Sequence, residues 1–321
     1  MAASCLVSCY NNYVGDYSKK ACGFANQTDV RSLIVGEGMT FSTGVALGGT
    51  INNDEDRKIT VGVDYSLVND RTYSLLVGHT FPYIVTLMKN VPSISALPAS
   101  IYELESDSGL PGTVIIRKGT HLGVLKVKVD SAAFLADAGR LYPKQVIPLA
   151  ITEGNGTEVI KGKETTVIGV RYENMLFGNW YHGGYAEVFD DGGELVRTDT
   201  YPTTIPQAEN QIWTLTTVGP FELTANAVGT EFNGATAQMK LTLGPDDTIA
   251  IEAVPGAKFE VQPDGESRFL RTKRLQDRKI VLNYKYVSGT ETIHAHDTLT
   301  FRNRLRDGVN EWQDENPKHY E

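Results

Sequence analysis

Two stretches decide the fold of this chain: FGNWYHGG at residues 177–184 and FRNRLRDGVNEW at residues 301–312. A Gly-x-Trp beside a first strand places an indole where it can close the floor of a small β-barrel. An arginine-rich last strand can supply a side chain that covers this indole, because a guanidinium stacks well on an aromatic ring. We therefore expect a closed barrel between the two stretches, with Trp180 at its floor and the Arg302–Arg306 run as its lid.

The segment from residue 172 to the end is predicted to be a meander of short strands. Its turns are rich in Asp and Gly, as in DDGG at 190–193 and GPDD at 244–247, which suits tight hairpins. About eight such strands form a small closed barrel. The expected strands span 176–188, 194–200, 212–218, 221–227, 237–243, 248–254, 279–287 and 292–302.

Alternation within these strands predicts that the barrel is filled by its own side chains. One face is apolar and the other polar in the strands around 221–227, 237–243, 248–254 and 292–302. Apolar faces that point inward fill the interior of a small barrel. A ligand is then expected at the rim, on the outer wall or at the domain junction, not in a roomy cavity.

Residues 30–171 are expected to form a separate domain. About seven strands with regularly spaced turns are typical of an immunoglobulin-like sandwich. The stretch 69–97, with Phe81-Pro82 and Val91-Pro92, is predicted to be irregular backbone. A short helical turn is expected at 131–138, with Asp130 as its cap. The domain boundary falls near Tyr172.

Length and charge limit the function. The 321 residues suit two domains, each able to bury a core, and 31 Gly with many Val, Thr and Tyr are typical of an all-β protein. The net charge of −9, with scattered basic residues, argues against nucleic-acid binding. An acidic protein remains compatible with carbohydrate, whose hydroxyl groups require hydrogen bonds more than charge.

The three cysteines, Cys5, Cys9 and Cys22, precede the first convincing strand, so no disulfide framework is expected. Leu6-Val7-Ser8-Cys9 matches the pattern at which bacterial lipoproteins are cut and lipidated at the cysteine. Either a signal peptide is truncated ahead of Cys9 or the match is chance; we favour the first. Residues 1–29 are then a leader and tether, and Cys9 carries the only membrane contact, since no apolar run of about 18 residues exists.

The chain resembles two-domain surface lipoproteins of gut Bacteroidetes, in which an immunoglobulin-like module precedes a lipocalin-like barrel. The resemblance rests on the two opening stretches and, in the first half, on Gly48-Gly49, residues 59–68, Leu97-Pro98 and Ile147-Pro148-Leu149. It implies an all-β fold with an N-terminal sandwich at 30–171 and a C-terminal lipocalin-like (calycin) barrel at 172–321. It also implies a glycan-binding protein on the outer membrane that captures oligosaccharide for an outer-membrane transporter complex.

Catalytic motifs are absent from the sequence. It contains no Gly-x-Ser-x-Gly, no phosphate-binding glycine loop and no carboxylate pair with an evident shared cleft. His294-x-His296 has a spacing that metal sites use, yet no third ligand stands out, and exposed strand residues are the favoured interpretation. We expect a non-enzymatic protein with no cofactor and no metal.

Sugar binding usually relies on an aromatic ring stacked on a pyranose and flanked by polar groups. The candidates in the second domain are Trp213, Tyr201, Tyr185 and Tyr181, whereas Trp180 and Trp312 are expected to be structural. Two alternatives stay open: an adhesion or structural protein that binds a protein partner, and a glycoside hydrolase with an unrecognised carboxylate pair.

Overall fold

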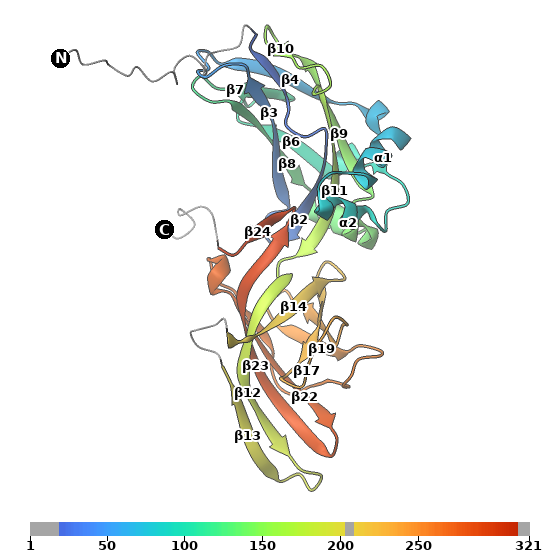
Figure 1. The fold of residues 1–321 in the computed structure, drawn as a ribbon, viewed down its shortest axis with the longest axis vertical. Coiled ribbons are helices and arrows are strands. Elements are labelled where there is room, and N and C mark those ends of the chain that lie inside the picture. The colour runs from blue at the N-terminus through green and yellow to red at the C-terminus, as the bar shows by residue number, and fades with distance from the viewer. Residues whose placement is uncertain (1–18, 203–208, 314–321) are drawn as a thin grey trace, which may run out of the picture. The chain divides into compact units, whose positions relative to one another are not determined.

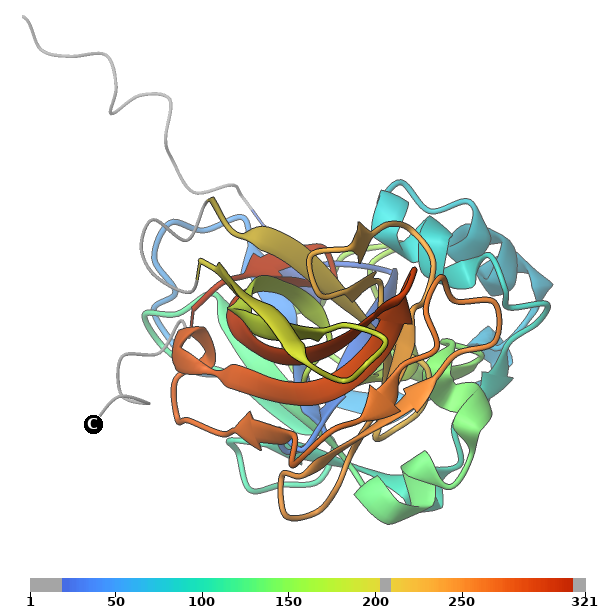
Figure 2. The same cartoon turned by 90° about the horizontal axis from the view of Figure 1, so that it is seen from below.

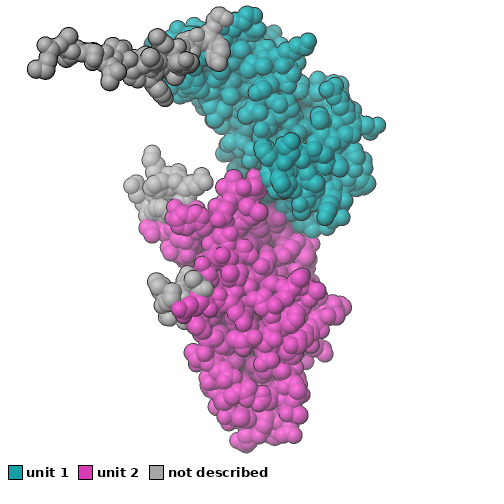
Figure 3. Space-filling view, viewed as in Figure 1, with its two compact units in different colours: residues 1–33, 37–171 teal, residues 34–36, 172–321 magenta. Residues whose placement is uncertain are grey.

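The computed structural model describes residues 19–202 and 209–313 and shows an all-β protein (Figure 1). Three short α-helices accompany the strands in these ranges. The chain divides into two compact units (Figure 3). Unit 1 comprises residues 1–33 and 37–171, and unit 2 comprises residues 34–36 and 172–321.

Unit 1 contains two sheets. The first has the strand order β10-β1-β3-β8-β6, and the second β2-β11-β9-β4-β7 with β5 beside β9. Buried apolar side chains of both sheets, such as Val45 and Val127 in the first and Ile59 and Ile147 in the second, form the core. The strands are β1 (Ala21–Phe24), β2 (Thr28–Val35), β3 (Thr40–Gly48), β4 (Arg57–Val63), β5 (Ser95–Ala96), β6 (Tyr102–Ser106), β7 (Thr113–Ile116), β8 (Leu122–Val129), β9 (Gln145–Glu153), β10 (Glu158–Val159) and β11 (Thr165–Asn174).

The predicted leader and tether, residues 1–29, is too long at its C-terminal end. Strand β1 and the start of β2 lie within residues 1–29 and belong to the two sheets. Cys22 pairs with Leu47 in β3 and is fully buried, and burial raises the pKa of its thiol. The flanking polar residues concealed this short strand in the sequence. Cys9 lies outside the described residues.

The stretch 69–97 contains two helices and the short strand β5, where irregular backbone was expected. Helix α1 (Asp70–Val77) begins at Asn69, whose side chain accepts a hydrogen bond from the backbone N–H of Thr72 at 3.0 Å. Helix α2 (Pro82–Met88) has its proline in the first turn, where proline favours a helix start and does not break it. The predicted turn at 131–138 contains α3 (Ser131–Leu135), capped by Asp130 at 2.9 Å from the Ala133 nitrogen. No helix in the described ranges is long and apolar enough to cross a membrane.

Unit 2 is a nearly closed barrel with the order β19-β18-β15-β14-β12-β23-β22-β20, and β21 also pairs with β22. A single bridge between Thr248 and Arg268 links the β19 end to β21. The strands curve strongly, as the red and orange ribbons show from below (Figure 2). The strands are β12 (Gly178–Phe189), β13 (Leu195–Tyr201), β14 (Gln211–Thr217), β15 (Glu222–Ala225), β16 (Ala227–Val228), β17 (Phe232–Asn233), β18 (Met239–Leu243), β19 (Ile249–Ala253), β20 (Gln262–Pro263), β21 (Arg268–Leu270), β22 (Lys279–Ser288), β23 (Glu291–Arg306) and β24 (Val309–Glu311).

The barrel interior is filled, as the alternation predicted. Leu223, Met239, Leu241, Ile251 and Leu299 are all buried in one cluster. Phe221 is an exception at 51% exposed, because β15 begins only after it.

The floor of the barrel differs from the expected arrangement. The Trp180 indole N–H donates to the Leu176 carbonyl at 3.0 Å, and the Phe301 ring meets the indole edge-on at 5.3 Å between centroids. The buried guanidinium of Arg304 lies over Phe177, 5.4 Å from the ring centroid. The arginine run therefore covers Phe177 and not Trp180 as expected. Phe301 packs against Trp180 instead.

Strand β12 changes partner along its length. Residues 178–182 pair with β14 and residues 184–189 with β13. Gly184 permits the change, because its φ is +136° and a Cβ there would lie 2.2 Å from the His296 carbonyl oxygen. The result is that four strands, β13-β12-β23-β22, continue as a sheet beyond the other barrel strands (Figure 1), with the short β20 paired to β22 at residues 284–285. We call this sheet, residues 184–189, 195–201, 281–288 and 291–298, the extension.

Candidate functional site

Two of the four predicted aromatic residues lie inside unit 2. Trp213 is 0% exposed and its ring stacks on His182 at 4.6 Å and 17°. Tyr201 is buried, and its hydroxyl donates to Asp297 Oδ1 at 2.7 Å. Both residues are buried, so neither offers an exposed ring face for a sugar to stack on, and a glycan contact at Trp213 or Tyr201 stays a prediction.

The other two predicted residues lie on the outward side of β12. Tyr185 is 42% exposed, whereas Tyr181 is half-buried. The Arg302 guanidinium lies 5.7 Å from the centroid of the Tyr181 ring and occupies the position where a sugar would otherwise stack. Tyr185 is thus the more accessible of the two rings.

The outward face of the extension brings further side chains beside Tyr185. The register places Tyr185 between Thr200 of β13 and His296 of β23, with Asn283 of β22 next to His296. Directly opposed residues of antiparallel strands share a face. We call the following set the platform: Tyr185, Glu187, Phe189, Thr198, Thr200, Asn283, Lys285, His294 and His296.

The platform rings are held in place by neighbouring strands. Tyr185 stacks on His296 at 4.6 Å and 22°, and His296 Nδ1 lies 2.8 Å from the Asn283 side-chain oxygen. In the next row Phe189 meets His294 edge-on at 4.8 Å, and His294 Nδ1 lies 2.6 Å from Asp264 Oδ2. A ring that is already ordered loses little conformational entropy when it binds a ligand.

The side chains around Tyr185 suit a polyhydroxylated ligand. The threonine hydroxyls and the Asn283 amide donate and accept hydrogen bonds, Glu187 accepts, and Lys285 donates. Sequence reasoning missed Phe189 and Asn283, and it considered His294 and His296 as a metal pair or, preferably, as exposed strand residues, but not as part of a binding surface. Their signal was the matching alternation of 185, 187 and 189 with 292, 294 and 296, which only the strand register brings side by side.

The structure brings no third metal-ligand candidate into a cluster with the two histidines in the part of the chain that it describes. No group of three or more His, Cys, Asp or Glu side chains in residues 19–202 and 209–313 is arranged to hold a metal ion. The Nδ1 atoms of the two rings instead contact Asp264 and Asn283.

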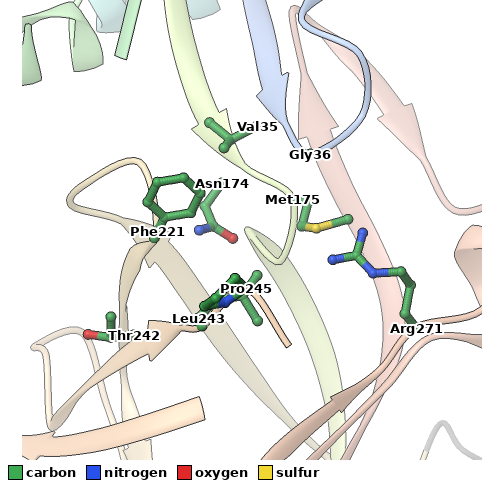
Figure 4. A pocket seen from close by; sticks show the side chains of 10 residues that line it. Val35, Gly36, Asn174, Met175, Phe221, Thr242, Leu243, Pro245 and Arg271 are labelled. Atoms are coloured by element: carbon green, nitrogen blue, oxygen red, sulfur yellow. The ribbon is translucent and has the colours of Figure 1, made fainter. Parts of the chain in front are cut away.

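Unit 2 also contains an apolar cavity of about 450 Å³ (Figure 4). Val35, Met175 and Leu243 are buried in its lining, while Phe221 and Pro245 complete its apolar wall. The sequence analysis did not predict this cavity, because the residues that line it come from segments far apart in the sequence.

Two of the polar side chains that line this cavity, Asn174 and Arg271, are engaged by the protein. The Asn174 amide donates to the Pro220 carbonyl at 3.0 Å and accepts from the Leu176 N–H at 2.9 Å. The Arg271 guanidinium lies 2.7 Å from Asp247 Oδ1. The cavity therefore matches an apolar group better than the hydroxyl groups of a sugar.

No protein-family model matches the chain, and no curated protein matches it in sequence. Solved structures do resemble it. A Bacteroides ovatus protein of unknown function aligns over 93% of this chain and 98% of its own, with a TM-score of 0.60 and 18% identity. A second B. ovatus protein of unknown function (92% and 100% covered, TM-score 0.42, 14% identity) and an auxiliary nutrient binding protein from Bacteroides thetaiotaomicron (88% and 92%, 0.39, 14%) are more distant.

At 18% identity, the first of these similarities shows a shared all-β fold along nearly the whole of both chains. The two scores below 0.5 support no conclusion about this protein. The resemblance to Bacteroidetes lipoproteins is thus supported at the level of fold, and assignment to that family stays a prediction.

Proposed function

We propose that the chain is a non-catalytic glycan-binding protein whose sugar-contacting surface is the platform. The observation that supports this most directly is Tyr185: its ring is 42% exposed, stacked on His296 and surrounded by hydrogen-bonding side chains. Aromatic rings of this kind contribute apolar contact at low entropic cost, while the neighbouring polar groups orient the sugar hydroxyls.

Two carboxylates close to the platform, Asp297 and Asp264, are already engaged by neighbouring side chains. A glycosidase needs two carboxyl groups about 5–9 Å apart on either side of the scissile bond. Asp297 is fully enclosed, and Asp264 is engaged by His294. Glu187 remains on the platform without a second carboxylate assigned to it, which is consistent with a contact residue and not with an acid–base pair.

We also propose that the protein is lipid-anchored through Cys9 at the outer surface of the outer membrane and passes oligosaccharide to an outer-membrane transporter complex. Support comes from Leu6-Val7-Ser8-Cys9 and from the family resemblance. Labelling of cells with a radioactive fatty acid tests the anchor: the wild-type protein should be labelled and Cys9→Ser should not. Equal labelling of both would reject lipidation at Cys9.

Glycan-array screening followed by affinity electrophoresis tests the binding function. The wild-type protein should be retained by at least one glycan, and Tyr185→Ala should bind it at least about tenfold more weakly, the scale of one lost stacking ring. Tyr142→Ala is the matched control, because Tyr142 of unit 1 is 40% exposed and lies outside the platform.

Each other outcome has a defined meaning. Retention unchanged in Tyr185→Ala would move the site away from the platform. No retention of the wild-type protein by a broad panel would reject glycan binding and leave the adhesion alternative. Release of reducing ends from a retained glycan would show a glycoside hydrolase.

A further inference from the structure

One polar cluster lies inside unit 2, directly behind the platform. Residues 293, 295, 299 and 301 of β23 point inward and are Ile, Ala, Leu and Phe, all buried, but the inward residue between them is Asp297. Asp297 is 0% exposed. A buried carboxylate is strongly unfavourable unless hydrogen bonds or an opposite charge compensate it.

The compensating groups come from three different strands. Tyr201 of β13 donates to Asp297 Oδ1 at 2.7 Å, and Tyr284 of β22 donates to Oδ2 at 2.6 Å. His182 of β12 places Nε2 2.9 Å from Oδ1, within ion-pair distance but outside hydrogen-bond geometry. The His182 ring is sandwiched between Tyr201 at 4.9 Å and Trp213 at 4.6 Å. One carboxylate thus links all four strands of the extension.

Strand β13 depends on this link more than the others do. Among the described residues it pairs with β12 alone and is an edge strand, and its residues 195–200 are all exposed. Tyr201 is its one buried side chain. Toward its other end, Arg197 forms a bidentate pair with Glu291 at 2.5 and 2.9 Å. This pair is partly exposed and screened by solvent, so it holds β13 less firmly than a buried contact does.

Strand β13 also forms one wall of the platform. Thr200, which lies beside Tyr185, is the residue before Tyr201 and points to the opposite side of the sheet. His296 has the same relation to Asp297. The inward pair Tyr201–Asp297 therefore lies directly behind the outward residues Thr200, Tyr185 and His296.

We infer that Asp297 is a positioning residue. Together with Tyr201 it holds β13 against β12 and β23, and it thereby fixes the position of the β13 side of the platform beside Tyr185. Its consequence for ligand binding rests on the proposed function, whereas its effect on β13 does not. Asp297 itself is fully enclosed.

Native-state hydrogen exchange measured by NMR tests the inference without any ligand. In Tyr201→Phe and in Asp297→Asn, the hydrogen-bonded amides of residues 195–201 should exchange about ten- to a hundredfold faster, because the first variant removes the buried hydroxyl donor and the second removes the charge of its acceptor. The amides of β18 and β19, elsewhere in the barrel, should change much less. Should Asp297→Asn fail to fold, Tyr201→Phe, which retains the ring, decides alone.

Tyr286→Phe is the matched control. Tyr286 is a buried tyrosine of β22 whose hydroxyl makes no hydrogen bond to Asp297, so exchange in β13 should stay within about twofold of wild type. Unchanged exchange in β13 of both test variants, or an equal rise in β13 and in β18–β19, would overturn the inference.

A glycan-binding measurement adds a second readout. Tyr201→Phe should weaken binding of a retained glycan while Tyr286→Phe does not. Unchanged affinity in Tyr201→Phe would contradict the role of β13 as a wall. If the wild-type protein retains no glycan, the proposed function fails, and the exchange experiment still decides whether Asp297 anchors β13.

Discussion

The two faces of the extension use similar residue types for opposite purposes. On the inner face, His182, Tyr201 and Tyr284 surround the buried carboxylate of Asp297. On the outer face, Tyr185 and His296 stack in contact with solvent. The identity of a side chain therefore does not reveal its role in this sheet; the direction in which its strand position points does.

We therefore expect substitutions on the inner face to lower the free energy of unfolding and substitutions on the outer face to weaken glycan binding. Loss of an inner polar group leaves its partners buried without hydrogen bonds, whereas water replaces any lost contact on the outer face. The following predictions test that division.

The largest effect is expected for Asp297→Ala. Two tyrosine hydroxyls and His182 would remain buried without their partner, which should lower the free energy of unfolding by about 3–5 kcal/mol. Chemical denaturation measures this. Asp264→Ala is the control. It removes the carboxylate that contacts His294 on the outer face and should lower the free energy of unfolding by less than about 1 kcal/mol.

Tyr185→Ala should show the reverse pattern. We expect at least about a tenfold loss of glycan affinity with a change in unfolding free energy below about 1 kcal/mol, because the ring is partly exposed. Isothermal calorimetry and denaturation on the same samples measure both. A stability loss as large as that of Asp297→Ala would remove the distinction between the faces.

Alkaline pH should weaken the inner face. Burial, together with the nearby Asp297 carboxylate, raises the pKa of Tyr201 and of Tyr284 above the ordinary value of a tyrosine. Both remain neutral in the folded protein while the unfolded chain ionises from about pH 10 upward. The unfolded state then binds fewer protons, so stability is constant below this range and falls above it by up to about 1.4 kcal/mol per pH unit for each group.

Denaturation between pH 8 and pH 11 in the wild-type protein and in Tyr201→Phe measures this dependence. The decline should be shallower in the variant, since one buried phenol is gone. An identical slope in both proteins would contradict the assignment of Tyr201 to this titration.

Tyr181→Ala is expected to have the smallest effect. Arg302 lies over this ring, so its loss should weaken glycan binding by no more than about threefold, well below the effect of Tyr185→Ala. Affinity electrophoresis with the same glycan compares the two variants. A larger loss in Tyr181→Ala would extend the binding surface toward β14.

Much of the fold could be predicted from local patterns. The eight expected segments of unit 2 each contain a strand, and the apolar set Leu223, Leu241 and Ile251 faces the interior. These predictions succeed because strand alternation is a short-range property. Helix α2 was missed because Phe81-Pro82 is equally compatible with a turn and with a helix start.

The candidate site was only partly predictable. Tyr185 and Tyr181 are on the outer side of β12, but Trp213 and Tyr201 are inside. Trp213 lies on the buried face of β14 with Leu215, and parity alone did not settle the direction of this face. Tyr201 ends a strand whose other residues are exposed, so no periodic signal marked it as buried.

The sequence by itself determined that the protein is all-β, that unit 2 closes as a filled barrel and that its strands have one apolar face, because these properties follow from alternation and turn residues. Only the tertiary structure decided which aromatic rings meet solvent and which surround Asp297. That choice depends on how β12 divides its pairing between β13 and β14 and on the register of β12 with β23. Register joins residues more than a hundred positions apart, and no local pattern contains that information.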